Sequence, residues 1–291
     1  MHLNLALYNL IIFRMKGAKD TMKRSWKILL VVVSISMVAM MSAGCSKKAG
    51  KGNSLQIAGS SSVQPLSEEL AAEFMGKHPD IKINVAGGGS GAGIKAAQNG
   101  TADIGASSRE LKPEEKTVKE IVIAKDGIAV IVNADNTVES LTLEQLQQVF
   151  TGEITNWNKL GGKDARISVI VREEGSGTRG AFEEIVMGKD KSITDKALVQ
   201  NSTGAIRTAV AGDSNAVGFI SIGALSKEVK PLKIDGAAAN MDNVLSGTYK
   251  ISRPFVYMTK EEPTGLGKEF IDFVLSPAGQ KIVGKAFIPV K

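Results

Sequence analysis

The chain has 291 residues, of which 43% are hydrophobic and 23% charged, and its formal net charge is +6. Residues 1–44 hold six of the 36 lysines and arginines but only one of the 30 aspartates and glutamates, so the other 247 residues carry a net charge of +1. Nucleic-acid binding normally requires a basic face on the folded domain, so the charge does not support a nucleic-acid partner. One cysteine and two histidines exclude a disulfide framework and a transition-metal site built from thiols and imidazoles.

The N-terminal region has the pattern of a secretory leader. Three basic residues precede a run of about 14 apolar or small residues, 28–41, which stops shortly before Cys45. A membrane-spanning helix needs roughly 20 apolar residues, so the run predicts a signal peptide over 1–44 with a lipobox-like end, cleaved before a lipidated Cys45. An uncleaved signal-anchor helix is the alternative. Residues 1–21 do not fit a signal sequence, and we expect translation to start at Met22.

Beyond the leader, a small, polar and basic stretch, 45–53, predicts a lipidated flexible tether. From residue 54 onwards, short apolar runs alternate with amphipathic stretches, which indicates an α/β fold with a largely parallel sheet. We expect two lobes, one formed by 54–127 together with 252–291 and the other by 128–251. Strands are predicted at 55–58, 81–85, 104–106, 127–133, 167–171 and 254–258, and helices at 65–75, 94–98, 143–150, 178–187 and 267–283.

Three segments share one design, in which a strand runs into glycines and serines and then directly into a helix: 59–63 (GSSSV), 87–93 (GGGSGAG) and 175–178 (GSGT). Helix N-termini present unpaired N–H groups and a partial positive charge, so an anion placed there gains several hydrogen bonds at once. Glycine lets the backbone approach closely, and serine or threonine adds a hydroxyl donor. One such segment is typical of ordinary helix capping, but three in one chain predict an anion site.

Two arginines accompany these segments. Arg109 follows the predicted strand 104–106, and Arg172 follows the strand that leads into the third segment. A guanidinium group matches a tetrahedral oxyanion with two parallel hydrogen bonds. A surface ion pair is the alternative role for either arginine, more so for Arg109. Arg179 is expected to pair with Glu183, four residues further along the same helix.

The motifs IAGSSSVQPL, GGGSGAGIKAAQNGTADIGASSREL and VREEGSGTRGAF resemble the phosphate-binding protein of the bacterial high-affinity phosphate ABC transporter, the PstS family. The resemblance covers essentially the whole chain after the leader. It implies a two-lobed, periplasmic-binding-protein-like fold of type II that closes on its ligand in the cleft. It further implies inorganic phosphate as ligand, the permease subunits of a phosphate ABC transporter as partners, no cofactor, and a monomer anchored by lipid on the outer face of the cell membrane.

The resemblance places the phosphate contacts on both predicted lobes: Ser61, Ser62, Val63, Ser90, Arg172, Ser176, Gly177 and Thr178. In well-known members of the family an aspartate accepts the proton of hydrogen phosphate. This chain has Ser108 at that position, followed by Arg109. We keep Ser108 and Arg109 as candidate ligand contacts. Glu174 is the predicted substitute acid, with Glu110 a less secure choice. Selectivity between phosphate and another tetrahedral oxyanion, sulfate or molybdate, therefore stays open.

Other function classes fit the sequence less well. An exported serine hydrolase would need a GxSxG elbow and a suitable histidine, and the chain offers only His78 beyond the leader. Gly87, Gly89 and Ala92 have the GxGxxG/A spacing of a dinucleotide site, but an exported chain has little access to NAD. A surface sensor or adhesin on the same fold is also compatible with the sequence. We expect a binding protein without enzymatic activity.

Overall fold

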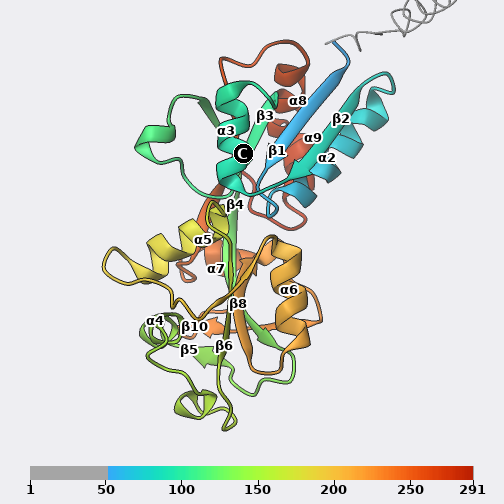
Figure 1. The fold of residues 1–291 in the computed structure, drawn as a ribbon. Helices are drawn as coiled ribbons and strands as arrows, with labels where there is room; N and C mark the ends of the chain where they lie inside the picture. The colour runs from blue at the N-terminus through green and yellow to red at the C-terminus, as the bar shows by residue number, and fades with distance from the viewer. Residues whose placement is uncertain (1–51, 291) are drawn as a thin grey trace, which may run out of the picture. The chain divides into compact units, whose positions relative to one another are not determined.

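The computed structural model describes residues 52–290 (Figure 1), and these residues belong to one compact unit. The predicted leader, the lipidated Cys45 and nearly all of the tether lie outside the described residues. Between residues 52 and 290, no helix is both long enough and apolar enough to cross a membrane.

The first part of the fold is a parallel three-stranded group with helices around it. β1 (Ser54–Gly59) lies in the middle and pairs in parallel with β2 (Lys82–Gly87) and with β3 (Ile104–Ser107). The apolar sides of these strands pack with Phe74, Phe270 and other residues into one buried cluster. The helices of this part are α2 (Gln64–Lys77), α3 (Ser90–Asn99), α8 (Gly265–Leu275) and α9 (Pro277–Val283), with a 3-10 turn at Pro113–Glu115.

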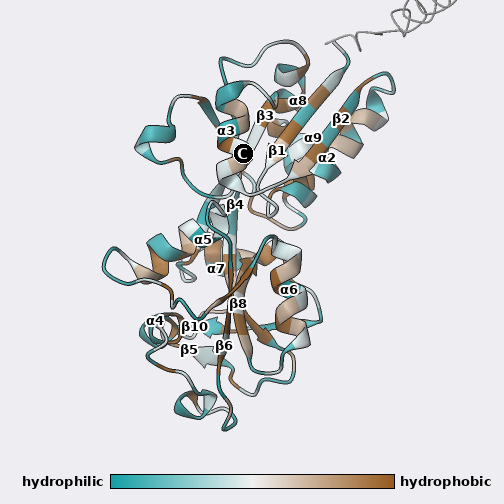
Figure 2. Cartoon of the chain, viewed as in Figure 1, coloured by the Kyte–Doolittle hydropathy of each residue, from teal (hydrophilic) through white to brown (hydrophobic). Residues whose placement is uncertain are grey.

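The second part has its own buried cluster, which includes Phe150, Trp157, Phe182 and Phe219. Figure 2 shows the hydrophobic colour concentrated on inner strands such as β8. The strands here are β6 (Ser168–Arg172), β7 (Leu198–Gln200), β8 (Ala216–Ser221) and β9 (Val229–Pro231), with a small pair, β5 (Ser140–Leu141) and β10 (Lys233–Ile234). The helices are α4 (Leu143–Thr151), α5 (Gly177–Phe182), α6 (Thr203–Gly212) and α7 (Met241–Leu245), with shorter turns at Trp157–Leu160, Glu183–Met187 and Ile222–Ala224.

One long strand joins the two parts. β4 (Lys119–Asn133) pairs with β11 (Ser252–Thr259) over its first half and with β8 over 128–132, so its two halves enter different buried clusters. Figure 1 shows β4 running from one group of strands to the other. Because β11 returns the chain antiparallel to β4, the sheet is mixed, in the order β2-β1-β3-β11-β4-β8-β6-β7.

The expected α/β class is confirmed, and each predicted strand and helix overlaps an element of the structure. The predicted helix 267–283 is two helices, because Ser276 is extended ahead of Pro277 and its hydroxyl caps the second one; a residue before proline disfavours the helical conformation. The helix predicted at 178–187 changes from α to π geometry at Glu183. The parallel pairs lie towards the outside of the sheet and the antiparallel pairs at its centre, where β4 and β11 connect the two parts.

Candidate functional site

The three predicted strand-to-helix segments are formed as expected. Segment 59–63 lies between β1 and α2, segment 87–93 covers the end of β2 and the start of α3, and segment 175–178 lies between β6 and α5. β1 and β2 are parallel, so their carboxyl ends meet at one edge of the sheet, where open α/β sheets bind ligands. At Gly59, a Cβ atom would lie 2.1 Å from the carbonyl oxygen of Ala106, so this turn requires glycine.

Hydroxyl groups from these segments converge on one another. The hydroxyl cluster consists of Ser60, Ser61, Ser62, Ser90, Ser108, Thr178 and Thr203. The Ser62 Oγ lies 2.8 Å from the Thr178 Oγ1 and 2.9 Å from the Thr203 Oγ1. Since Ser62 belongs to the first part of the fold and both threonines to the second, the cluster connects the two parts.

The remaining members lie beside this contact. The Ser60 hydroxyl donates to the Ser108 Oγ at 2.8 Å, and the Ser108 N–H donates to the Ser90 Oγ at 3.0 Å. Gly177 approaches so closely that a Cβ atom there would lie 2.2 Å from the Ser90 Oγ and 2.7 Å from the Ser108 Oγ. The Gly91 N–H donates to the Gly175 carbonyl oxygen at 2.9 Å, so backbone atoms of two of the segments also meet.

Arg172 brings a positive charge to this cluster. Its side chain is 2% exposed, and its Nη1 donates to the Thr203 Oγ1 at 3.2 Å. Its Nε and Nη2 donate to the two carboxylate oxygens of Glu173 at 2.8 and 2.7 Å. The guanidinium plane is therefore fixed by Glu173 while one edge faces the hydroxyls, which is an arrangement suited to an oxyanion.

Serine and threonine hydroxyls can donate or accept, so the hydrogen bonds within the cluster can reorient around a bound oxyanion. The starts of α2 and α3 have no side-chain cap, at Val63 and Gly89 respectively. Ser176 does cap α5, because its Oγ accepts the Arg179 N–H at 3.3 Å, while its own proton remains free to be donated.

Two predicted site residues, Arg109 and Glu174, make no hydrogen bond to the hydroxyl cluster or to Arg172. The Arg109 guanidinium donates to both carboxylate oxygens of Glu115 at 2.7 and 2.8 Å, and the hydrogen bond from Arg109 lowers the pKa of Glu115 despite partial burial. Glu174 is exposed, and the acid beside Arg172 is its neighbour Glu173. The ion-pair alternative for Arg109 is therefore the one observed, and Glu173, not Glu174, is the acid that contacts Arg172. Arg179 pairs with Glu183 at 2.8 Å, which confirms that prediction.

Sequence reasoning missed Thr203 as a member of the site. Its Oγ1 contacts Arg172 and Ser62, and its N–H donates to the Ser61 Oγ at 3.2 Å. The signal was present, because strand β7 is followed by Ser202, Thr203 and a glycine at the start of α6. This is a fourth copy of the strand-to-helix design.

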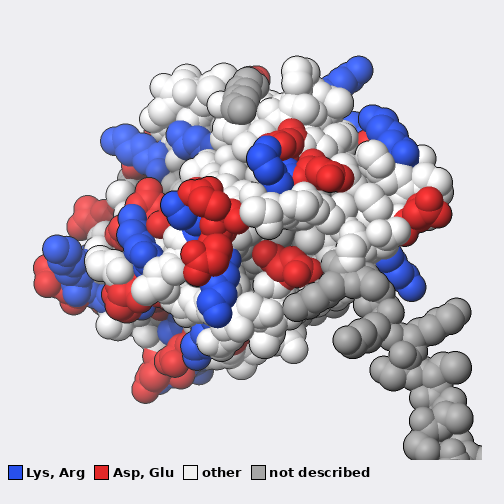
Figure 3. All heavy atoms as spheres, turned by 90° about the horizontal axis from the view of Figure 1, so that it is seen from above, with Lys and Arg blue, Asp and Glu red and all other residues white. Residues whose placement is uncertain are grey.

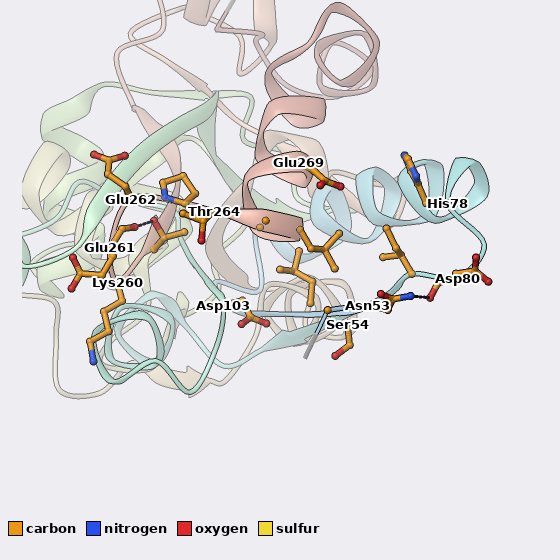
Figure 4. A pocket seen from close by; sticks show the side chains of 18 of the residues that line it. Asn53, Ser54, His78, Asp80, Asp103, Lys260, Glu261, Glu262, Thr264 and Glu269 are labelled. Carbon is orange, nitrogen blue, oxygen red and sulfur yellow. Dashed lines mark hydrogen bonds between the residues drawn. The ribbon is translucent and has the colours of Figure 1, made fainter. Parts of the chain in front are cut away.

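A large cavity among the described residues lies elsewhere, between the end of α2 and the start of α8 (Figure 4). It has a volume of about 890 Å³, and its lining includes Lys77, His78, Asp103, Glu261 and Glu269. None of the predicted site residues lines it. Across residues 52–290, no group of three or more histidine, cysteine, aspartate or glutamate side chains could hold a metal ion.

Comparison with known proteins places this fold and site. Residues 46–278 match the family model of a PBP superfamily domain, which defines the class of the protein. A Bacillus subtilis (strain 168) protein named phosphate-binding protein PstS is 32% identical over 288 residues, covering 92% of this chain and 95% of that protein. The chain belongs to the PstS family of phosphate-binding proteins.

Two solved structures are also similar. One, from Clostridium perfringens, is named a phosphate ABC transporter substrate-binding protein with bound phosphate. It is 48% identical, with a TM-score of 0.80, over 82% of this chain and 100% of that one. The other, an ABC-type phosphate transport receptor from Vibrio cholerae, is 38% identical with a TM-score of 0.67, over 80% of this chain and 99% of that one.

Proposed function

We propose that this chain is an extracytoplasmic solute-binding protein that captures inorganic phosphate and delivers it to an ABC importer. The observation that carries the proposal is the convergence of a buried arginine with hydroxyls from four strand-to-helix segments. Such a site offers many neutral donors and one positive charge, which suits a tetrahedral oxyanion. The names of the relatives and the phosphate bound in the Clostridium perfringens structure support the same ligand.

The ligand contacts we propose come from both parts of the fold. Arg172 supplies the charge, and the hydroxyls of the cluster donate hydrogen bonds to the phosphate oxygens. Ser108 stands where well-known relatives have an aspartate, so this position lacks the carboxylate that rejects a fully ionised oxyanion. The full set is Ser60, Ser61, Ser62, Val63, Ser90, Ser108, Arg172, Ser176, Gly177, Thr178 and Thr203.

We also propose that the two buried clusters are the cores of two lobes, 54–127 with 252–291 and 128–251. The division is supported by the cluster memberships, which change along β4 between Ala124 and Ile128. Ser62 and Ser90 then belong to one lobe, and Thr178 and Thr203 to the other. A ligand held between them would favour the closed arrangement, because it binds both sets of donors at once.

The location and partners follow from the same proposal. A lipid on Cys45 would hold the protein on the outer face of the cell membrane as a monomer, next to the permease subunits that receive phosphate. Mass spectrometry of the native protein should show a chain that starts at lipidated Cys45.

Charges of both signs are interspersed on the face shown in Figure 3, and this face does not resemble a basic nucleic-acid surface.

Catalysis has no support in the site. A serine nucleophile needs a base within hydrogen-bond reach, whereas His78 lies beyond the end of α2, stacks on Phe74 with ring centres 4.4 Å apart, and lines the cavity of Figure 4. We therefore propose a binding protein without enzymatic activity. Turnover of a phosphate ester by the purified protein would contradict this.

Parallel calorimetric titrations with phosphate, sulfate and molybdate test the proposed ligand. Phosphate should bind with a stoichiometry of one and more tightly than either of the others. Ser108 stands in place of the carboxylate that would select phosphate, so a second candidate function is the binding of sulfate or molybdate. Tighter binding of either anion than of phosphate would establish that function. If none of the three binds, the proposed function is wrong.

A further inference from the structure

A buried ion pair lies where the two parts of the fold join. Asp126 on β4 and Arg253 on β11 are cross-strand partners, and the Asp126 Oδ2 accepts from Arg253 Nη2 at 3.1 Å and from its Nε at 3.3 Å. Both side chains are 1% exposed. Among residues 52–290, Asp126 is the one buried acid, and Arg172 and Arg253 are the two buried arginines.

The strand order brings this pair next to the candidate site. β6, β8, β4 and β11 are successive neighbours in the sheet. Arg172 ends β6, and Ser221 ends β8 opposite Ile128 of β4, two residues beyond Asp126. Asp126 therefore lies two residues along β4 from the level at which β8 ends, and β6, which ends at Arg172, runs parallel to β8.

The charge of Arg172 also acts on Arg253. Burial lowers the pKa of Arg253, and the positive charge of Arg172 lowers it further, while Asp126 opposes both effects. The two guanidinium groups are therefore within electrostatic reach. An anion at Arg172 would be attracted by Arg253 and repelled by Asp126.

The pair is incompletely satisfied by its surroundings. Within the described part of the chain, the Asp126 Oδ1, the Ser221 Oγ and the Arg253 Nη1 make no hydrogen bond of normal distance and angle. The Ser221 hydroxyl and the Ile222 N–H still lie near enough to the Asp126 carboxylate to lower its pKa, so Arg253 Nη1 is the atom of the pair left without any such neighbour. A buried ion pair that serves stability alone needs its remaining donors and acceptors satisfied. Unsatisfied buried polar atoms are rare and are associated with functional roles.

We propose that Asp126 and Arg253 form a second charge element of the oxyanion site, in which Arg253 strengthens anion binding and Asp126 limits it. This inference rests on the proposed function and extends it to residues that do not touch the ligand. Charges act over longer distances in a buried environment than in water. The two residues therefore tune affinity through their fields, without a hydrogen bond to the anion.

A pH effect with a defined sign follows. Burial raises the pKa of Asp126 to about 6, against the attraction of Arg253. When Asp126 takes up a proton, the site loses a nearby negative charge, so anion affinity should rise as the pH falls through about 6. The polar and charged groups that face the pair or lie within its electrostatic reach are Ser221, Tyr249, whose pKa is raised by burial, and Arg172.

Neutral variants test the proposal by the sign of their effects. Calorimetry with inorganic phosphate at neutral pH and low salt should show tighter binding by Asp126→Asn and weaker binding by Arg253→Gln, each on the order of fivefold. The double variant should bind much as the parent does. Asp272→Asn, which removes an exposed partner of Lys268, should leave affinity unchanged. If both single variants bind more weakly, the pair has only a structural role and the proposal is overturned.

Removing one partner of a buried pair is destabilising, so each variant is first checked for folding by thermal melting. If a single variant does not fold, the double variant serves as the reference for a pH series with the parent. The affinity of the parent should rise relative to the double variant as the pH falls through about 6, and parallel profiles would overturn the proposal. A parent that binds no oxyanion at all would instead refute the proposed function.

Discussion

The hydroxyl cluster and the cavity of Figure 4 are two polar regions of the same molecule, and they differ in how their side chains are held. In the cluster, Ser62, Ser90, Ser108 and Thr178 are at most 3% exposed and are hydrogen-bonded to one another or to Thr203, whose hydroxyl also accepts from Arg172. In the cavity, charged side chains such as Lys260 and Glu269 are exposed. We therefore place the proposed binding site by the convergence of buried polar groups from separate segments and not by cavity volume.

The largest expected effect is at Arg172. Arg172→Ala should weaken phosphate binding by at least about 2 kcal/mol, roughly thirtyfold, because it removes two hydrogen bonds from a charged donor. Lysine should restore only part of the affinity, since an ammonium group cannot reproduce the planar fork. Calorimetry on both variants checks this. Parent-like binding by Arg172→Ala would show that the site has been placed wrongly.

Gly177→Ala should have the next largest effect. The new Cβ atom would lie 2.2 Å from the Ser90 Oγ, across the contact between the two parts of the fold. We expect a loss of about 1.5 kcal/mol in binding, roughly tenfold, with an unchanged melting temperature if the two parts simply separate. Gly212→Ala is the matched control, because a Cβ atom there meets nothing within 4 Å. Equal affinities for the two variants would contradict the close approach at Gly177.

Arg172 and Gly177 also show which residues of the candidate site can be predicted from the sequence. Gly177 and Arg172 were found because a strand, a Gly/Ser turn and a helix follow one another directly, which is a local pattern. An ion pair was the alternative role given to Arg109, but its partner was not predicted, because Glu115 reaches it only through the 3-10 turn at Pro113–Glu115. The first half of β4 was missed because its apolar run, 121–124, is short and has charged residues on both sides, while the second half has a longer apolar run.

Thr203 escaped prediction for a related reason. Strand β7 before it has only three residues, of which two are apolar, so the apolar run is too short to predict a strand. The mixed direction of the sheet depends on where β11 returns, which is a tertiary property. Local signals thus specified most of the site, while partners brought together by the long return of the chain needed the structure.

Thr203→Val should weaken phosphate binding less than the substitutions at Arg172 and Gly177, and it tests one hydroxyl of the cluster. The valine keeps the shape but removes the hydroxyl that contacts Arg172 and Ser62. We expect a loss on the order of 1 kcal/mol, about fivefold in affinity, measured by titration with phosphate. Thr203→Ser retains the hydroxyl and should bind within about twofold of the parent. If serine and valine behave alike, the hydroxyl plays no part in binding.

The smallest effect is expected in the cavity of Figure 4, where Glu269→Gln and Lys260→Met should leave phosphate affinity within about twofold of the parent. Both side chains are exposed, so water and salt screen their charges from an anion at Arg172. The same titration, repeated at two salt concentrations, separates a screened charge from a direct contact. A loss of affinity comparable to that of Arg172→Ala, at either salt concentration, would mean that the cavity binds phosphate. Cavity volume would then indicate the binding site better than the convergence of buried hydroxyls.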